Sequence, residues 1–199
     1  MDILDQMREI SRPTVAQREW MKGIDLRLAT VDDLETIAEE CIEAGLYGLD
    51  LETTGLDQRA FPNDAGRKET VDKIVGYCVA SSVDKGWYIP VRHREDGAAA
   101  NVPPRKVVEM INQIQEGGAR AVFHNAKFDQ KFLQYDPAGE VGDWDETTTW
   151  EDTFVLAYLR NTRERNKGLK GLSKRELERE MIEITELFPP EAVKAGKLD

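Results

Sequence analysis

The chain has 199 residues, of which 40% are hydrophobic, so it can bury the core of a folded domain and is not a disordered chain. No apolar stretch is long enough to span a membrane, and the first residues do not resemble a signal peptide. The two cysteines, Cys41 and Cys78, have neither the spacing of a zinc site nor that of a disulfide framework. These features predict a cytoplasmic protein with reduced thiols and no membrane partner.

The net charge of −11 argues against a nucleic-acid partner, but the charge is unevenly distributed. Seven basic residues and one acid, Glu164, lie between Arg160 and Arg175, so this segment carries a net charge of +6. A solvated basic face is the ordinary interpretation of such a segment. The alternative is that the segment meets nucleic-acid phosphates on one side of an otherwise acidic protein.

The first elements are predicted from caps and hydrophobic spacing. Ile24–Leu28 alternates weakly and is expected to form an edge strand. Thr30 opens a helix and has the spacing of a capping box with Asp33. The apolar residues after it recur with helical spacing, namely Leu34, Ile37, Ala38, Cys41 and Ile42. Gly45 ends this helix, and a strand begins at Leu46.

The remaining elements are predicted from apolar runs, turn residues and helix signals. They are, in order, a polar loop at Gln58–Asp72, strands at Lys73–Ser81 and Trp87–Val91, a helix from Pro103 to Gly117, a strand at Arg120–Phe123, helices at Ala126–Gln134 and around Phe154–Leu159, and a last helix ending by Leu187. That last helix starts either at Leu169 or at a capping box formed by Ser173 and Glu176. This order predicts an α/β fold whose mixed sheet, three antiparallel strands and then parallel strands, is flanked by helices.

Two carboxylates stand near the end of the strand that begins at Leu46. Side chains at positions i and i+2 of a strand point to the same face, so Asp50 and Glu52 are expected to lie side by side. Paired carboxylates repel each other unless a cation lies between them, and hard oxygen ligands suit Mg²⁺ or Mn²⁺. A solvated acidic pair is the ordinary alternative, but the Leu-rich strand and the Thr-Thr-Gly turn after Glu52 favour a metal site.

A third carboxylate follows the strand at Arg120–Phe123. Asn125 is suited to cap the next helix, and Asp129 lies just over one turn inside it. If this strand runs beside the one carrying Asp50 and Glu52, the three carboxylates meet at the strand ends, where open α/β sheets place their sites.

These stretches together resemble the DEDD superfamily of 3′-5′ exonucleases, in particular the proofreading domain of family A DNA polymerases. Asp50–Leu56, Asp-Leu-Glu-Thr-Thr-Gly-Leu, resembles the first motif. His124–Leu133, which includes Asp129, resembles the second. The Asp-Thr pair at Asp152 and the segment Gly168–Leu177 look like the parts that follow the second motif in this family.

The resemblance implies an RNase H-like exonuclease domain at residues 24–199, preceded by an N-terminal appendage at residues 1–23. It implies that Asp50, Glu52 and Asp129 are both the catalytic residues and the ligands of two Mg²⁺ or Mn²⁺ ions. It also implies two sets of substrate-binding residues: Thr53, Thr54 and Leu56 approach the terminal nucleotide, and Asn125 and Phe128 shape the groove that holds the strand. The implied partners are the 3′ end of single-stranded DNA and a polymerase domain further along a longer chain.

The sequence departs from the family at the fourth carboxylate, which should stand in a Tyr-x-x-x-Asp or His-x-x-x-Asp context. Tyr135 and Tyr158 are followed four positions later by Gly139 and Thr162. We therefore expect the last motif to lie beyond Asp199 and this chain alone to be slow or inactive. Two alternatives stay open: a self-standing exonuclease acting on RNA or oligonucleotides, and a non-catalytic RNase H-like module that binds nucleic acid.

Two polar residues near the motifs are given structural roles. His124 is expected to stabilise the structure and not to act as a base. Asp152 is expected to cap the helix that follows it, with a supporting role at the metal site as the alternative.

Overall fold

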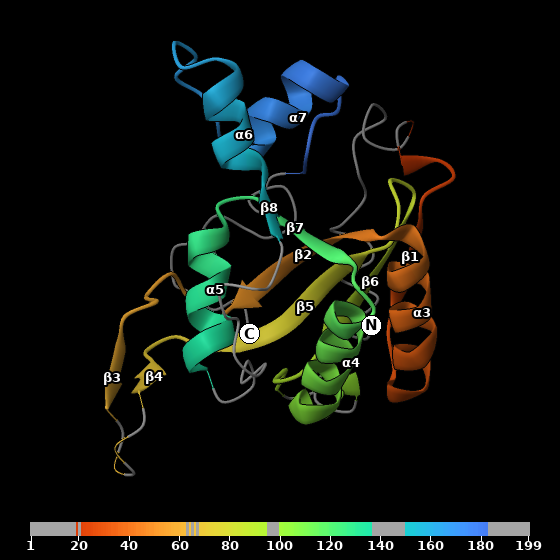
Figure 1. Cartoon of the computed structure of the whole chain (residues 1–199), viewed down its shortest axis with the longest axis vertical. Helices are drawn as coiled ribbons and strands as arrows, with labels where there is room; N and C mark the ends of the chain where they lie inside the picture. The colour runs from red at the N-terminus through yellow and green to blue at the C-terminus, as the bar shows by residue number, and fades with distance from the viewer. Residues whose placement is uncertain are drawn as a thin grey trace, which may run out of the picture. The chain divides into compact units, whose positions relative to one another are not determined.

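Figure 1 shows the computed structural model, which describes residues 19, 21–62, 64, 66, 68–94, 100–136 and 150–182. Most of the predicted appendage at residues 1–23 lies outside these residues. The last of the described helices ends at Leu177, before the predicted limit at Leu187. The strands are β1 (Asp25–Leu28), β2 (Leu46–Thr53), β3 (Ala60–Pro62), β4 (Lys68–Thr70), β5 (Ile74–Ala80), β6 (Lys85–Pro90), β7 (Arg120–Phe123) and β8 (Trp150–Asp152). The helices are η1 (Val31–Asp33), α3 (Leu34–Ala44), α4 (Pro104–Glu116), α5 (Ala126–Tyr135), α6 (Thr153–Arg160) and α7 (Leu169–Leu177).

The larger sheet is mixed and has the strand order β1-β6-β5-β2-β7-β8. Its centre, β6-β5-β2, is antiparallel, whereas β7 and β8 continue from β2 as parallel strands. The edge strand β1 pairs with β6 in parallel. This topology, flanked by helices, confirms the predicted RNase H-like α/β fold with three antiparallel strands followed by parallel ones.

Local sequence signals determine where the first helix begins and ends. The Thr30 backbone N–H donates to Asp33 Oδ2 at 2.7 Å, which completes the predicted capping box before α3. Gly45 ends α3 with φ of 68°, a conformation that glycine adopts without a steric penalty.

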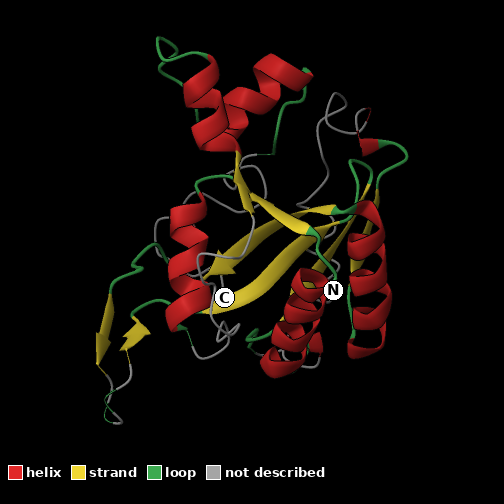
Figure 2. Ribbon diagram, viewed as in Figure 1, coloured by secondary structure: helices red, strands yellow, loops and turns green. Residues whose placement is uncertain are grey.

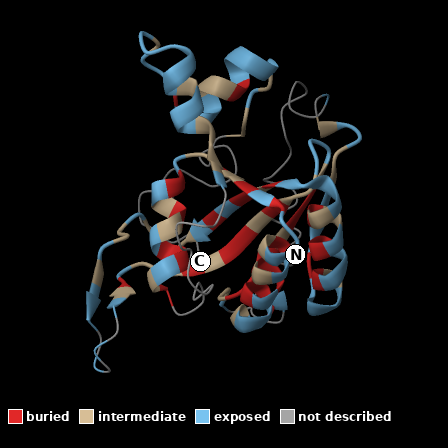
Figure 3. Ribbon diagram, viewed as in Figure 1, coloured by how far each residue is buried: buried red, intermediate tan, exposed pale blue. Residues whose placement is uncertain are grey.

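One face of the sheet is covered by α3 and α4, which lie next to each other in Figure 2. Strand residues on this face are buried in one core with the apolar residues of both helices, as the red segments of Figure 3 show. These strand residues are Leu49, Leu51, Tyr77, Val79, Trp87 and Ile89. Since strand side chains alternate, Asp50 and Glu52 point to the opposite face, where Asp50 has Cys78 as its cross-strand neighbour.

One prediction made from local patterns is wrong, and one of two alternatives is confirmed. The polar segment Gln58–Asp72 is not only a loop, because β3 and β4 pair within it as a short antiparallel hairpin. Of the two predicted starts of the last helix, Leu169 is confirmed, with Gly168 as its N-cap, and the capping-box pattern at Ser173 does not mark a helix start. Ser173 instead lies inside α7, and its hydroxyl donates to the backbone carbonyl of Arg179 at 2.8 Å.

The chain divides into two compact units. Residues 24–160 form one, and residues 161–199 together with residues 1–23 form the other, which contains α7. The sheet and the three predicted metal ligands all belong to the first unit. The division into residues 1–23 and 24–199 stays a prediction. None of the described helices is both long and apolar enough to cross a membrane.

Candidate active site

Asp50 and Glu52 stand in the second half of β2, on the sheet face that α3 and α4 leave uncovered, and both residues are exposed. Opposite them on β5 are Cys78 and Gly76. The pairing of β2 with β5 shifts by one residue directly after Glu52, so a bulge ends the regular ladder there. The two carboxylates therefore lie together at the end of a central strand, as the alternation of the sequence predicts.

Asp129 reaches the same place from α5. The parallel pairing of β2 with β7 ends at Gly48 and Val122, so the later residues of β2 lie beyond the end of β7. There the Leu51 backbone N–H donates to Asp129 Oδ1 at 3.2 Å. Because Leu51 lies between Asp50 and Glu52, the buried Asp129 carboxylate is held against the backbone that carries the other two.

The charge of Asp50 affects the pKa of both Asp129 and Glu52, so the three carboxyl groups are electrostatically coupled. Burial and the charge of Asp50 raise the pKa of Asp129 to about 7. Glu52 is open to solvent on one side, but the protein around it removes part of its hydration, and this effect together with the charge of Asp50 raises the pKa of Glu52. The pKa of Asp50 itself is raised by loss of solvent, against a smaller opposing effect of His124. All three carboxylates are thus held in surroundings that disfavour their combined negative charge.

This charge pattern fits a divalent cation of the oxygen-preferring kind. In the described part of the chain, none of the three carboxylates forms an ion pair with a basic side chain. The donor set is made of hard oxygens, which suits Mg²⁺ or Mn²⁺ better than zinc. Among these same residues, no three acidic, histidine or cysteine side chains are already close enough to hold an ion together. The residues fit such an ion by the chemistry of their oxygen atoms.

The turn after β2 is organised by Asp72, which sequence patterns did not single out. The Thr54 hydroxyl donates to Asp72 Oδ1 at 3.0 Å, and the Asp57 backbone N–H donates to Asp72 Oδ2 at 2.7 Å. A side chain at Gly55 would collide with this carboxylate, since a Cβ there would lie 2.5 Å from Asp72 Oδ2. The Thr53 hydroxyl donates to the Gly55 carbonyl at 2.6 Å. The Thr-Thr-Gly segment is therefore a rigid turn beside Glu52.

Solved structures that share this fold were compared with the chain. The catalytic core of RRP6 from Trypanosoma brucei matches with a TM-score of 0.55 at 14% identity, over 96% of this chain and 49% of that one. The POL domain of Pol1 from M. smegmatis, in complex with a DNA primer-template and dNTP, matches with a TM-score of 0.54 at 17% identity, over 81% of this chain and 24% of that one. NrnC from Brucella melitensis with bound Mg²⁺ matches with a TM-score of 0.50 at 14% identity, over 88% and 72%. No protein-family model and no curated protein matches the chain.

The chain has the fold of the DEDD 3′-5′ exonucleases. The predicted resemblance is thereby confirmed for the fold, and the roles of individual residues stay predictions. The two stretches that resemble DEDD motifs lie at the end of β2 with its turn and at the start of α5, which carries Asp129.

The other residues predicted to contact the substrate, Leu56, Asn125 and Phe128, differ in how far they are exposed. Leu56, at the tip of the turn after β2, is 82% exposed. Asn125 is exposed and directly precedes α5. Phe128 is only partly buried and packs against the core, with its ring 5.1 Å from that of Phe132. Leu56 and Asn125 are therefore accessible to a nucleotide, whereas much of Phe128 is used in packing.

The second motif is stabilised by Asp152, at the end of β8. Its Oδ1 accepts hydrogen bonds from the backbone N–H groups of Asn125 (3.0 Å) and Phe154 (2.8 Å), and its Oδ2 accepts one from Ala126 (3.0 Å). Asp152 thus caps α6, as predicted, and also the start of α5. The prediction that the Asn125 side chain caps α5 is wrong, because Asn125 has φ of 69° and makes no side-chain cap bond.

His124 lies in the same motif and has a structural contact. The Thr153 hydroxyl donates to the Phe123 carbonyl at 2.9 Å, and His124 Nδ1 lies 2.9 Å from the same hydroxyl oxygen. Because that hydroxyl proton points to the carbonyl, Nδ1 of His124 donates to the oxygen. The contact joins the end of β7 to the start of α6.

We predict that Asp152→Ala lowers the free energy of unfolding by about 2 kcal/mol, because it removes the caps of two helices at about 1 kcal/mol each. Urea unfolding followed by circular dichroism measures the change. Asp33→Ala, which breaks only the capping box with Thr30, is the matched control and should cost about half as much. A loss for Asp152→Ala no larger than that of the control would contradict the double capping role.

The basic segment Arg160–Arg175 is not uniformly solvent-facing. Lys167 is only 6% exposed, and its ammonium group donates to the Glu164 carbonyl. Arg175 forms an ion pair with Glu176 at 2.9 Å. The simple picture of one solvated basic face is therefore wrong for Lys167, and a contact of the segment with nucleic acid stays a prediction.

Proposed function

We propose that this chain is a divalent-metal-dependent 3′-5′ exonuclease that removes the terminal nucleotide of a single-stranded nucleic acid. The observation that carries the proposal is the hydrogen bond from the Leu51 N–H to Asp129, which holds the third carboxylate against the strand segment of Asp50 and Glu52. The DEDD exonuclease fold supports the proposal independently.

Asp50, Glu52 and Asp129 are the proposed ligands of Mg²⁺ or Mn²⁺. A bound pair of such ions would supply an activated water and stabilise the leaving 3′ oxygen. The similar NrnC structure contains Mg²⁺, which supports the choice of metal. In our proposal the carboxylates hold the ions, and the rigid turn formed by Thr53 and Thr54 places Leu56 against the terminal nucleotide. Asn125 and the exposed part of Phe128 contact the strand from the side of α5.

Two finer functions are compatible with this chemistry. Proofreading of DNA beside a polymerase domain is favoured by the similarity to Pol1, although the match covers only 24% of that chain. A self-standing nuclease acting on RNA or short oligonucleotides is favoured by the similarities to RRP6 and NrnC, and the chain covers 72% of NrnC. We infer that the second is the better supported, because more of the similar structures are of this kind.

To test the proposal, the chain is incubated with a single-stranded oligonucleotide labelled at its 5′ end, in the presence of Mn²⁺, and a chelator is then added. The lengths of the labelled products are followed over time. Stepwise shortening from the 3′ end that stops on chelation is expected, and a 3′-phosphate should block it. DNA and RNA of the same sequence are compared, since faster digestion of DNA favours proofreading and faster digestion of RNA the self-standing nuclease. Digestion is expected to be slow, since neither Tyr135 nor Tyr158 is followed by an acid four positions later. Binding of the strand with no detectable shortening on long incubation with Mg²⁺ or with Mn²⁺ would overturn the proposal and favour a non-catalytic binding module.

A further inference from the structure

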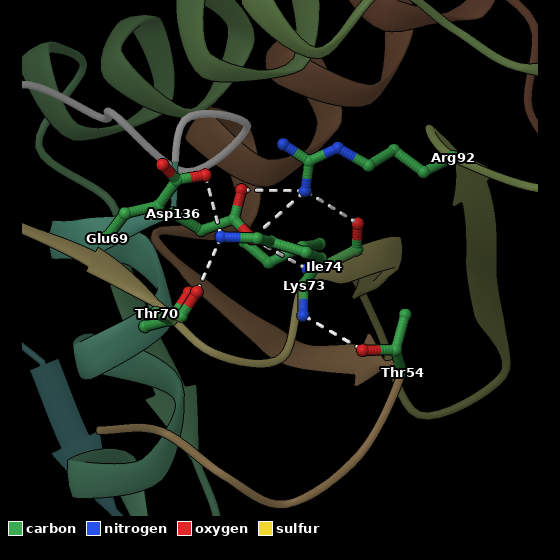
Figure 4. A network of polar contacts seen from close by, with 7 residues as sticks. All are labelled: Thr54, Glu69, Thr70, Lys73, Ile74, Arg92 and Asp136. Atoms are coloured by element: carbon green, nitrogen blue, oxygen red, sulfur yellow. Dashed lines mark hydrogen bonds and ion pairs between the residues drawn. The ribbon is translucent and has the colours of Figure 1, made fainter. Parts of the chain in front are cut away.

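An ion pair between the buried Asp136 and the part-buried Arg92 joins the C-terminal end of α5 to the sheet (Figure 4). Asp136 directly follows α5, and its side chain is fully buried. Arg92 Nη1 donates to Asp136 Oδ1 at 2.7 Å and to the Ile74 carbonyl at 3.1 Å. The Ile74 backbone N–H donates to Asp136 Oδ2 at 2.9 Å. Both the carboxylate and the guanidinium are therefore bonded to the same residue of β5.

Ile74 lies at the bulge in the β2–β5 pairing, beside Glu52. The pairing of β2 with β5 passes from Glu52 opposite Gly76 to Thr53 opposite Ile74, so Val75 is left without a partner on β2. A bulge leaves backbone groups outside the regular ladder, and these need other partners. Asp136 and Arg92 supply partners for both the N–H and the carbonyl of Ile74. The ion pair thus binds the irregular backbone directly opposite Thr53, the last residue of β2.

The same helix carries Asp129. Asp129 and Asp136 are seven positions apart, which is about two turns of helix. Asp129 is bonded to Leu51, and Asp136 is bonded to the residue opposite Thr53. Besides the packing of Phe132 and Leu133 in the core, polar contacts therefore tie α5 to β2 through Asp129 and to β5 through Asp136.

We propose, on the basis of the function proposed above, that Arg92 and Asp136 are positioning residues for the carboxylate site: they hold α5 and the bulge so that Asp129 stays beside Asp50 and Glu52. Neither touches the carboxylates. Stability alone is a weak explanation for such a pair, since buried ion pairs often stabilise a fold no more than apolar residues would. Groups that orient metal ligands in this way commonly affect metal affinity or activity by about 10- to 100-fold.

The test uses Asp136→Asn, which keeps the shape of the side chain and removes its charge. Amide hydrogen exchange by NMR should show the Leu51 N–H exchanging about 10-fold faster, while the Ile111 amide inside α4 is unchanged. Mn²⁺ binding, followed by electron paramagnetic resonance, should weaken by about the same factor. The kcat for nucleotide release should fall about 10-fold with little change in the KM for the oligonucleotide.

Glu40→Gln is the matched control, because it removes the part-buried ion pair between Glu40 and Lys85, which involves neither α5 nor the bulge. It should change none of the three readouts. Asp136→Asn together with Arg92→Gln leaves no buried unpaired charge and replaces the single variant if that one fails to fold. In this double variant too, the Leu51 N–H is expected to exchange faster than in the unaltered chain.

The outcomes separate this proposal from the proposed function. If the unaltered chain digests nothing, the function fails, whereas the Leu51 exchange and Mn²⁺ measurements still decide the positioning role. If the unaltered chain is active and the variants lose only folding stability, with Leu51 exchange, Mn²⁺ binding and kcat unchanged, the pair is structural and the positioning role is overturned.

Discussion

Asp50→Asn is expected to slow metal-dependent release of the 3′-terminal nucleotide by at least about 10²-fold, because misplacing groups at a reacting centre costs this much. Asp50 is the central member of the carboxylate group, since its charge raises the pKa of both Glu52 and Asp129. Its substitution therefore removes the proposed ligand whose charge affects the pKa of the other two carboxylates. The measurement is the initial rate of mononucleotide release from a 3′-labelled single strand with Mn²⁺ present.

Asp32→Asn is the control for this prediction. Asp32 is an exposed acid in η1, so its substitution makes the same change in net charge at a distance from the motifs. It should leave the rate unchanged. A rate for Asp50→Asn close to that of the unaltered chain would show that Asp50 is not a ligand of the reacting ions.

Asp129→Asn is expected to stabilise the metal-free chain at pH 8 by on the order of 4 kcal/mol. The native pKa of Asp129, about 7, lies above the ordinary value of 3.8, so the folded chain binds the proton more tightly than the unfolded chain does. The stability contributed by the neutral carboxyl is complete below about pH 4 and is lost as the pH rises through 7. Asparagine is neutral throughout and can still accept the Leu51 hydrogen bond.

The difference in unfolding free energy between Asp129→Asn and the unaltered chain should therefore be near zero at pH 4 and grow until about pH 8. Asp57→Asn is a control of opposite sign, because hydrogen bonds from Arg59 lower the pKa of Asp57 to about 2. Mn²⁺ should stabilise the unaltered chain more than Asp129→Asn, since an ion bound only by the folded state adds to stability. A pH-independent difference for Asp129→Asn would contradict the raised pKa.

Several parts of the fold could be predicted because their causes are local. The capping box of Thr30 and Asp33 and the left-handed Gly45 depend on residues a few positions apart. The common face of Asp50 and Glu52 follows from strand alternation alone. The β3–β4 hairpin could not be predicted in this way, because its strands are three residues each and lack an alternating apolar pattern.

Two helix caps were not predicted correctly from sequence spacing. Asn125 has the right residue type and position for a helix cap, yet the N–H groups at the start of α5 are bonded by Asp152, 27 positions from Asn125. The Ser173 and Glu176 spacing suited a cap too, but the helix began one turn earlier at Leu169. A side chain from a neighbouring strand competes with local caps, and sequence spacing does not reveal such competitors.

The sequence by itself determined the residue types of the site and the strand face that carries Asp50 and Glu52, because side-chain direction in a strand depends only on position along the chain. Only the tertiary structure decided that Asp129 meets them, through the Leu51 N–H that lies beyond the last β2–β7 pair. The same holds for Arg92 and Asp136, which are 44 positions apart and meet at the backbone of Ile74. Such contacts depend on which strands are neighbours and where their pairing ends, and these properties arise only when the whole sheet assembles.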